Sequence, residues 1–194
     1  MSKRTVFNML SRAASKYADK PYLSSKGDLG WVRTSFSEAE KKARTLACAF
    51  VEIGLKKGDK VAILSEAKTD WIVTEFAALF AGGISVPLSI KLLPEEVPFR
   101  VNHSDAALFA VSENTLEKVI SQWNKYQNKD LKLIVLDRPS DKIKNICQQQ
   151  GFDARQLLFI SDLYKLGEVN IEEHGPAVEA LENSTGENDV VTIS

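Results

Sequence analysis

The fold is decided by residues 54–111, GLKKGDKVAILSEAKTDWIVTEFAALFAGGISVPLSIKLLPEEVPFRVNHSDAALFAV. Three short apolar runs in this stretch, 61–64, 84–88 and 107–111, predict buried strands. A helix that is apolar on nearly every side, at about 70–82, lies between the first two runs. Strands covered on both faces read as continuous apolar runs, so this pattern favours an α/β fold with a mostly parallel sheet and helices on both faces. The stretch itself holds no catalytic motif.

Upstream of this core, the sequence predicts a docked helix, a hairpin and a second helix. Apolar residues at helical spacing place the first helix against the domain, through Val6, Leu10, Ala13, Ala14 and Tyr17. Residues 20–35 are β-prone around turn formers at 26–30, which predicts a small hairpin at the edge of the fold. In Ser37-Glu38-Ala39-Glu40 the spacing of a hydroxyl and a carboxylate predicts a capping box for the next helix. Gly54 is expected to end that helix.

Downstream, the alternation of helices and strands becomes weaker. Pro94 is expected in the first turn of a short helix, with Glu95 and Glu96 at its positive N-terminal end. Further on, the pattern predicts helices at 115–126 and 140–150, strands at 131–136 and 157–160, and a short helical turn at 161–166. Residues 167–188 are acidic and expected to be irregular, with a helix at 176–181 left open, and residues 189–193 predict a last strand.

These elements divide one α/β subdomain into four parts. Residues 1–36 form the N-terminal helix and hairpin, and residues 37–166 form the α/β core. Residues 167–188 form an acidic linker, and residues 189–194 form the last strand.

Composition excludes several classes of function. The chain of 194 residues is 44% hydrophobic and 26% charged, with a formal net charge of −1, so no overall field attracts nucleic acid or an anionic membrane. Cys48 and Cys147 lie outside any metal-ligand spacing, which favours a reducing, cytoplasmic setting. The N-terminus lacks the apolar core of a signal peptide. A helix lying on a membrane surface is the alternative to the docked N-terminal helix.

No complete catalytic constellation occurs in the sequence. There is no GxGxxG after a strand, no GxxxxGK[ST] and no GxSxG. The two histidines, His103 and His174, have no neighbouring triad pattern, and His103 is expected to lie at a helix terminus, where an imidazolium is favoured. The residues alone therefore predict a scaffold and assign no catalytic group or metal ligand.

Residues 34–96 resemble the N-terminal portion of the adenylate-forming enzymes, specifically the acyl-CoA synthetases. The family pattern runs from a Gly-Asp turn through a Trp-containing helix to a Val-Pro-Leu strand, and it is matched in order by Gly54, Gly58, Asp59, Val61, Trp71, Ala81, Gly82, Val86, Pro87, Leu88, Pro94 and Glu95. One departure precedes Trp71, where the family usually has an asparagine and this chain has Ser65-Glu66-Ala67-Lys68. The pattern is specific for the superfamily and suggests its long-chain fatty acid branch.

The resemblance implies a fragment of a larger enzyme. In the family a D-x-x-x-I strand, matched here by residues 189–193, runs into a Ser/Thr/Gly-rich loop that holds ATP phosphates, and Ser194 falls where that loop would begin. The parent would use ATP and Mg²⁺ to activate a fatty acid or other carboxylate as acyl-AMP and would then form the CoA thioester. This fragment is expected to be inactive alone and to bind no cofactor, with the remainder of the same polypeptide as its partner. Whether Ser194 is a natural terminus is left open.

The resemblance also gives one candidate binding residue, Lys91, at a place where some family members have a basic residue near a CoA phosphate. The alternative is a solvated loop lysine. Two other functions stay open: a free-standing α/β module that binds a nucleotide or other ligand at the carboxyl ends of its strands, and an interaction or dimerisation domain built on the N-terminal helix and hairpin. A homodimer, peripheral membrane association and the acyl chain length are also left open.

Overall fold

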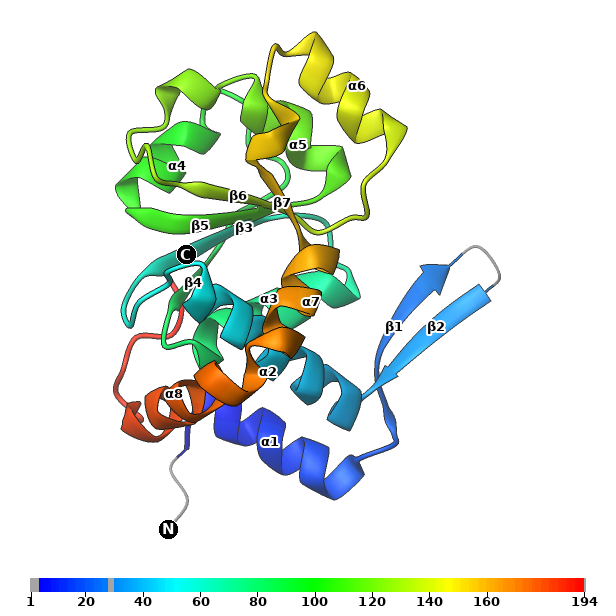
Figure 1. Cartoon of the computed structure of the whole chain (residues 1–194), viewed down its shortest axis with the longest axis vertical. Helices are drawn as coiled ribbons and strands as arrows, with labels where there is room; N and C mark the ends of the chain where they lie inside the picture. Colours follow the sequence, from blue (N-terminus) through cyan, green and yellow to red (C-terminus); the bar gives the residue numbers. More distant parts are fainter. Residues whose placement is uncertain (1–3, 28–29, 194) are drawn as a thin grey trace.

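A five-stranded parallel sheet lies at the centre of the computed structural model, which describes residues 4–27 and 30–193 (Figure 1). The strand order is β4-β3-β5-β6-β7, and each neighbouring pair is parallel. The strands are β3 Lys60–Leu64, β4 Ile84–Pro87, β5 Ala106–Val111, β6 Lys132–Val135 and β7 Leu157–Phe159. The predicted fold class and the predicted core strands are confirmed, with ends that differ by a residue or so.

Helices cover both faces of this sheet because its strands are apolar on both sides. Along β3, Val61 and Ile63 pack into one core cluster, while Ala62 and Leu64 pack into the other, as the two-residue period of a strand requires. The first face carries α1 Val6–Tyr17, α2 Phe36–Glu52, α3 Thr69–Phe80, α7 Ile160–Val169 and α8 Ile171–Ser184. The second carries α4 Val97–His103, α5 Glu113–Ile120 and α6 Asp141–Gln149 (Figure 1).

The predicted capping box is present, but it lies two residues earlier than expected. Ser35, not Ser37, is the N-cap of α2: its Oγ accepts the Glu38 N–H at 3.2 Å, and the Glu38 carboxylate accepts the Ser35 N–H at 2.8 Å. The sequence TSFSEAE contains two overlapping S-x-x-E patterns. The earlier one is used because it leaves the Ser37 hydroxyl free to donate to the Ala18 carbonyl, and this bond ties the helix to the preceding turn.

The N-terminal helix and hairpin form as predicted, but with differences in packing. Helix α1 buries Phe7, Leu10 and Ala14, whereas Tyr17, expected on the buried face, is 37% exposed. Strands β1 Pro21–Gly27 and β2 Gly30–Ser35 form a two-stranded antiparallel sheet of their own, separate from the main sheet. Figure 1 shows this hairpin extending away from the body of the molecule. Part of its predicted turn, 28–29, lies outside the described residues.

The short helix and the acidic segment differ from the predictions. The prediction for Pro94 is wrong: Pro94 and Glu95 lie in the turn before α4, and the proline in the first turn of this helix is Pro98. The expected irregular segment 167–188 is mostly helical, because it contains the end of α7 and all of α8, which runs through Pro176. The helix left open at 176–181 is part of α8, whereas residues 185–188 are irregular. The predicted helical turn at 161–166 is likewise a ten-residue helix.

The predicted helix at 115–126 is shorter than expected. It is α5, which ends at Ile120, followed by a 3-10 turn at Trp123–Lys125. The last predicted strand forms only in part: Thr192 makes an isolated parallel bridge to Ser85, so residues 191–193 lie beside β4 at the edge of the sheet.

Candidate functional site

The loops that follow β3, β5 and β6 share a connected set of charged and hydroxyl side chains. The Glu66 carboxylate accepts hydrogen bonds from Ser112 Oγ at 2.6 Å and from Asn114 Nδ2 at 3.1 Å. Lys68 Nζ lies 2.6 Å from Asp137 Oδ1 and 3.6 Å from Glu66 Oε1. The carboxyl ends of parallel strands meet at one edge of a sheet, so loops that are far apart in sequence converge here. Glu66 and Lys68 belong to the stretch that departs from the family pattern.

The same network holds the first turns of α5 and α6. The second oxygen of Asp137 accepts the Glu113 N–H at 2.7 Å, and the Glu113 carboxylate accepts the Ser140 hydroxyl and pairs with Lys142 Nζ at 3.1 Å. The hydrogen bond from Ser140 lowers the pKa of Glu113. These charges are paired with one another, so the network braces the loops. Within 4–27 and 30–193, no group of three or more His, Cys, Asp or Glu could hold a metal ion.

A half-buried carboxyl, that of Asp70, lies close to this edge, in the first turn of α3. Tyr164 Oη donates to Asp70 Oδ1 at 3.0 Å and thereby joins α7 to α3. Burial raises the pKa of Asp70, and burial together with the neighbouring carboxylate raises the pKa of Tyr164. The two groups satisfy each other, so their geometry indicates a role in packing.

An open groove of about 600 Å³ runs along the edge strand β4 on the α4 side of the sheet. Apolar side chains from β4, the loop after it and the end of the chain form part of its wall. Its polar wall contains Lys60, Arg100 and Asp105, so the charge there is positive even with His103 neutral. The residues that line it are Lys60, Val86, Pro87, Leu88, Ser89, Leu92, Arg100, His103, Ser104, Asp105 and Ile193. A positive groove with an apolar wall suits an anionic ligand that also carries an apolar part.

Helix α4 supplies the cationic side of the groove. Arg100 and His103 are three positions apart, so they share a face of the helix, and both are exposed. His103 is the last residue of α4, as predicted, and its ring stacks on Phe99 with centroids 5.8 Å apart. Sequence reasoning missed Arg100. The sequence shows that Arg100 and His103 are three positions apart, but it does not show the groove that both residues line.

Lys91 is exposed and lies in the loop after β4, between two residues that line the groove, Ser89 and Leu92. Its own side chain is not part of the wall. Lys118 Nζ of α5 donates to the Ile90 and Leu92 carbonyls at 2.7 and 2.6 Å, so the loop around Lys91 is fastened. The structure therefore places Lys91 at the rim of the groove. His174 lies elsewhere, on α8, with Nε2 2.6 Å from Glu52 Oε2.

The fold and the groove define the class of protein: a parallel α/β domain with a basic, partly apolar groove at the edge of its sheet. The comparison with protein families is more specific, since residues 10–193 match the model described as AMP-binding enzyme. This chain belongs to the AMP-binding enzyme family, and the resemblance inferred from its sequence is confirmed.

Curated relatives are similar to most of this chain, but the chain matches only a small part of each relative. Fatty acyl-CoA synthetase A of Dictyostelium discoideum is 29% identical over 149 residues, which is 77% of this chain and 21% of that protein. The long-chain-fatty-acid--CoA ligase of Salmonella typhimurium is 28% identical over 144 residues, which is 72% of this chain and 24% of that protein. The chain thus spans about a fifth to a quarter of the length of these relatives.

Solved structures support the fold. The adenylation domain of a carboxylate reductase from Mycobacterium chelonae matches with a TM-score of 0.68 at 21% identity, over 84% of this chain and 29% of that one. The anthranilate CoA ligase AuaEII matches with a TM-score of 0.67 at 19% identity, over 84% of this chain and 28% of that one. At this level of identity the likeness concerns the fold alone, and the fold is that of the N-terminal part of an adenylation domain.

Proposed function

We propose that this chain is the N-terminal part of an AMP-forming acyl-CoA synthetase. The family match over residues 10–193, together with the similarity to two fatty acyl-CoA ligases from distant organisms, carries the proposal. In the reaction, a carboxylate oxygen of the substrate attacks the α-phosphorus of ATP and pyrophosphate leaves. The CoA thiolate then attacks the acyl carbon, and AMP leaves. Mg²⁺ would neutralise charge on the phosphates, and we assign no residue of this chain to it.

Within this reaction, most of the described residues act as scaffold. The paired network at the carboxyl edge fixes the loops after β3, β5 and β6, and the segment 191–193 beside β4 leads toward the position of the family's phosphate loop. A cytoplasmic location stays a prediction of the sequence, supported by two buried free cysteines, Cys48 and Cys147.

The proposal is tested by comparing this 194-residue chain with a longer polypeptide that contains it and the sequence that follows. Each is incubated with ATP, Mg²⁺ and fatty acids of short to long chain, and pyrophosphate release is measured, followed by thioester formation when CoA is added. The longer polypeptide should do both, and the chain alone should do neither. A longer polypeptide that folds but activates none of the carboxylates contradicts the proposal.

We further propose that the rim and cationic wall of the β4 groove contact CoA phosphate through Lys91 and Arg100. The net positive charge of the groove and the fastened loop around Lys91 support this role. Loss of a charge-assisted hydrogen bond corresponds to about tenfold in binding. Lys91→Glu and Arg100→Glu in the longer enzyme should therefore raise KM for CoA about tenfold and leave pyrophosphate release in the first step unchanged. Lys132→Glu, an exposed site on β6, is the matched control. Unchanged CoA kinetics in both variants would remove the assignment.

A free-standing nucleotide-binding module is the other candidate from the sequence, and no observation favours it, because the charged groups at the carboxyl edge are paired with one another. Calorimetric titration of this chain with ATP, AMP and CoA separates the two functions. Saturable micromolar binding of ATP or AMP to the chain alone would favour the module.

A further inference from the structure

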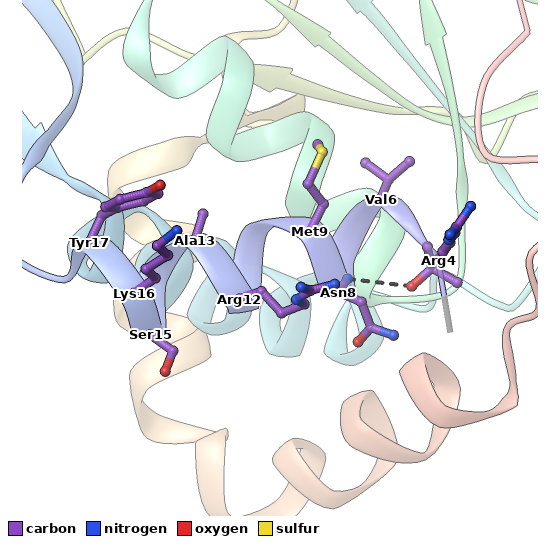
Figure 2. Close-up of a pocket in the computed structure, with 10 residues that line it drawn as sticks. Arg4, Val6, Asn8, Met9, Arg12, Ala13, Ser15, Lys16 and Tyr17 are labelled. Atoms are coloured by element: carbon purple, nitrogen blue, oxygen red, sulfur yellow. Dashed lines mark hydrogen bonds between the residues drawn. The ribbon is translucent and has the colours of Figure 1, made fainter. Parts of the chain in front are cut away.

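Ser85, the second residue of the edge strand β4, is a point where separate parts of the chain meet. It pairs with Val61 of β3 on one side and with Thr192 on the other, and its side chain contacts α3. The hollow of about 820 Å³ on the outer face of α1 differs, because the residues that line it all belong to 4–17 (Figure 2). Functional sites bring polar groups together from several elements, which favours the surroundings of Ser85.

The backbone of β4 holds the neighbouring segment at Ser85. Alternate residues of a parallel strand direct their backbone groups to opposite sides. Ile84 N–H donates toward the β3 side at 2.8 Å, whereas Ser85 and Pro87 face the open edge. Proline has no N–H to donate. The bond to the Val191 carbonyl, at 2.9 Å, therefore comes from Ser85 N–H, and the Ser85 carbonyl accepts the Ile193 N–H at 2.9 Å.

The side chain of Ser85 joins β4 to α3. It is wholly buried, and its Oγ donates to Glu75 Oε1 of α3 at 3.1 Å. Its register partner Val61 packs into the core cluster on the α3 face of the sheet, so Ser85 points to the same face. This hydrogen bond fixes the position of β4 relative to α3 at the residue whose backbone holds the segment 191–193.

Glu75 has no cationic partner in the described part of the chain, since no ion pair within 4–27 and 30–193 includes it. Its carboxyl is half-buried, and burial raises its pKa. Burial, together with the charge of Glu75, also raises the pKa of Tyr22 on β1. A half-buried carboxylate without a cation costs free energy, so an apolar residue of similar size would pack there at least as well. The geometry therefore indicates a role for the hydrogen bond to Ser85 itself.

We propose that Glu75 and Ser85 are positioning residues for the ATP step of the proposed acyl-CoA synthetase, and this inference rests on that proposed function. The segment 191–193 leads toward the position of the family's phosphate loop, and its bridge to the sheet is made at Ser85. When the side-chain bond fixes β4 to α3, the start of that loop keeps one position at the sheet edge. A displacement of about 1 Å in such a site can lower the rate about 100-fold. Neither residue is assigned a contact with ATP.

The first test is amide hydrogen exchange of the 194-residue chain, followed by NMR, which needs no enzymatic activity. Ser85→Ala should lower the protection of the amides at positions 85 and 193 about tenfold, the factor that corresponds to a charge-assisted hydrogen bond. Glu75→Met should do the same, whereas Glu75→Gln, which keeps an acceptor oxygen, should retain most of the protection. The amide of Ile84, which bonds toward β3, should change far less.

The matched control is Ser11→Ala, which removes another hydroxyl–carboxylate hydrogen bond, from Ser11 Oγ to Glu40 Oε1 at 2.6 Å between α1 and α2. It should leave the amides at 85 and 193 unchanged. The double variant Glu75→Met/Ser85→Ala removes both polar partners, so its urea midpoint should stay close to that of the wild type while the amide at 193 still exchanges faster. The positioning role is overturned if protection falls equally at 84 and 85, or if the control reproduces the loss.

The second test is kinetic and uses the longer polypeptide. Ser85→Ala and Glu75→Met should lower kcat/KM for ATP in pyrophosphate release about tenfold and leave KM for CoA unchanged, and Glu75→Gln should stay close to the wild type. Unchanged ATP kinetics in an active enzyme whose amide at 193 is less protected would overturn the role. A wild-type longer polypeptide without activity contradicts the proposed function instead, and the exchange at position 193 alone then decides whether the pair holds the segment.

Discussion

Gly167, on the buried side of α7, allows α7 to cross α2 at backbone contact. A Cβ at this position would lie 1.9 Å from the Thr45 carbonyl oxygen and 2.8 Å from its carbonyl carbon. Because the clash is with backbone in the middle of α2, no side-chain rotation relieves it, and α7 must move by more than an ångström. Gly167→Ala should therefore destabilise the chain although alanine is the better helix former.

The magnitude follows from two opposing effects. Replacing glycine by alanine inside a helix contributes about 1 kcal/mol, whereas overpacking a buried contact costs about 1–3 kcal/mol, with backbone clashes at the upper end. The net expected loss is about 2 kcal/mol in the free energy of unfolding, measured by urea titration followed by circular dichroism. The matched control is Gly186→Ala, where a Cβ meets nothing within 4 Å and the loss of chain entropy in the unfolded state should stabilise by about 0.4–1 kcal/mol. If Gly167→Ala is as stable as the wild type, the close crossing of α2 and α7 is refuted.

Three further changes test particular contacts by the same urea titrations. Ser35→Ala should cost about 1 kcal/mol by removing the cap of α2, and Ser35→Asp should retain most of the stability. Arg44→Lys should cost about 1 kcal/mol, because lysine cannot make the paired contacts of the guanidinium with Glu182 at 2.9 and 3.3 Å; equal stability would contradict it. Burial raises the folded-state pKa of Asp70, so wild-type stability is lost as pH rises from the unfolded pKa of about 3.9 toward the folded one. The stability of Asp70→Asn relative to wild type should then rise over this interval, and a constant difference would refute the raised pKa.

The core strands and α3 were predictable because their signal is local. A buried parallel strand needs an apolar run of a few residues, and 61–64 and 107–111 provide it whatever their neighbours are. The cap of α2 was predictable as a motif but not in register, because two overlapping patterns satisfy the same spacing. The choice between them depends on the contact of Ser37 with Ala18, which belongs to a preceding turn.

Helix α8 could not be predicted, because its stability comes from residues far away in the chain. Its acidic composition and internal Pro176 favour an irregular segment. In the structure, Glu182 pairs with Arg44, 138 positions away, and His174 pairs with Glu52, 122 positions away. A single buried residue of the helix, Val178, anchors it in the core beneath α2 and α3. The conflict with local propensity is resolved only by packing.

The candidate binding groove beside β4 also could not be predicted from local sequence. Lys91 was indicated only through family resemblance, and Arg100 was not indicated at all. The groove that they flank is lined by residues from separate parts of the chain, from Lys60 to Ile193, so it is visible only in the folded structure. The sequence also left open a free-standing module that binds its ligand at the carboxyl ends of the strands, where the loops carry several charged side chains. The charged side chains of these loops pair with one another, since Lys68 makes ion pairs with both Glu66 and Asp137. A phosphate-bearing ligand requires unpaired positive charge next to apolar surface. In the described part of the chain such a surface lies beside β4, so we expect the ligand contacts at the edge strand and not at the carboxyl ends of the strands.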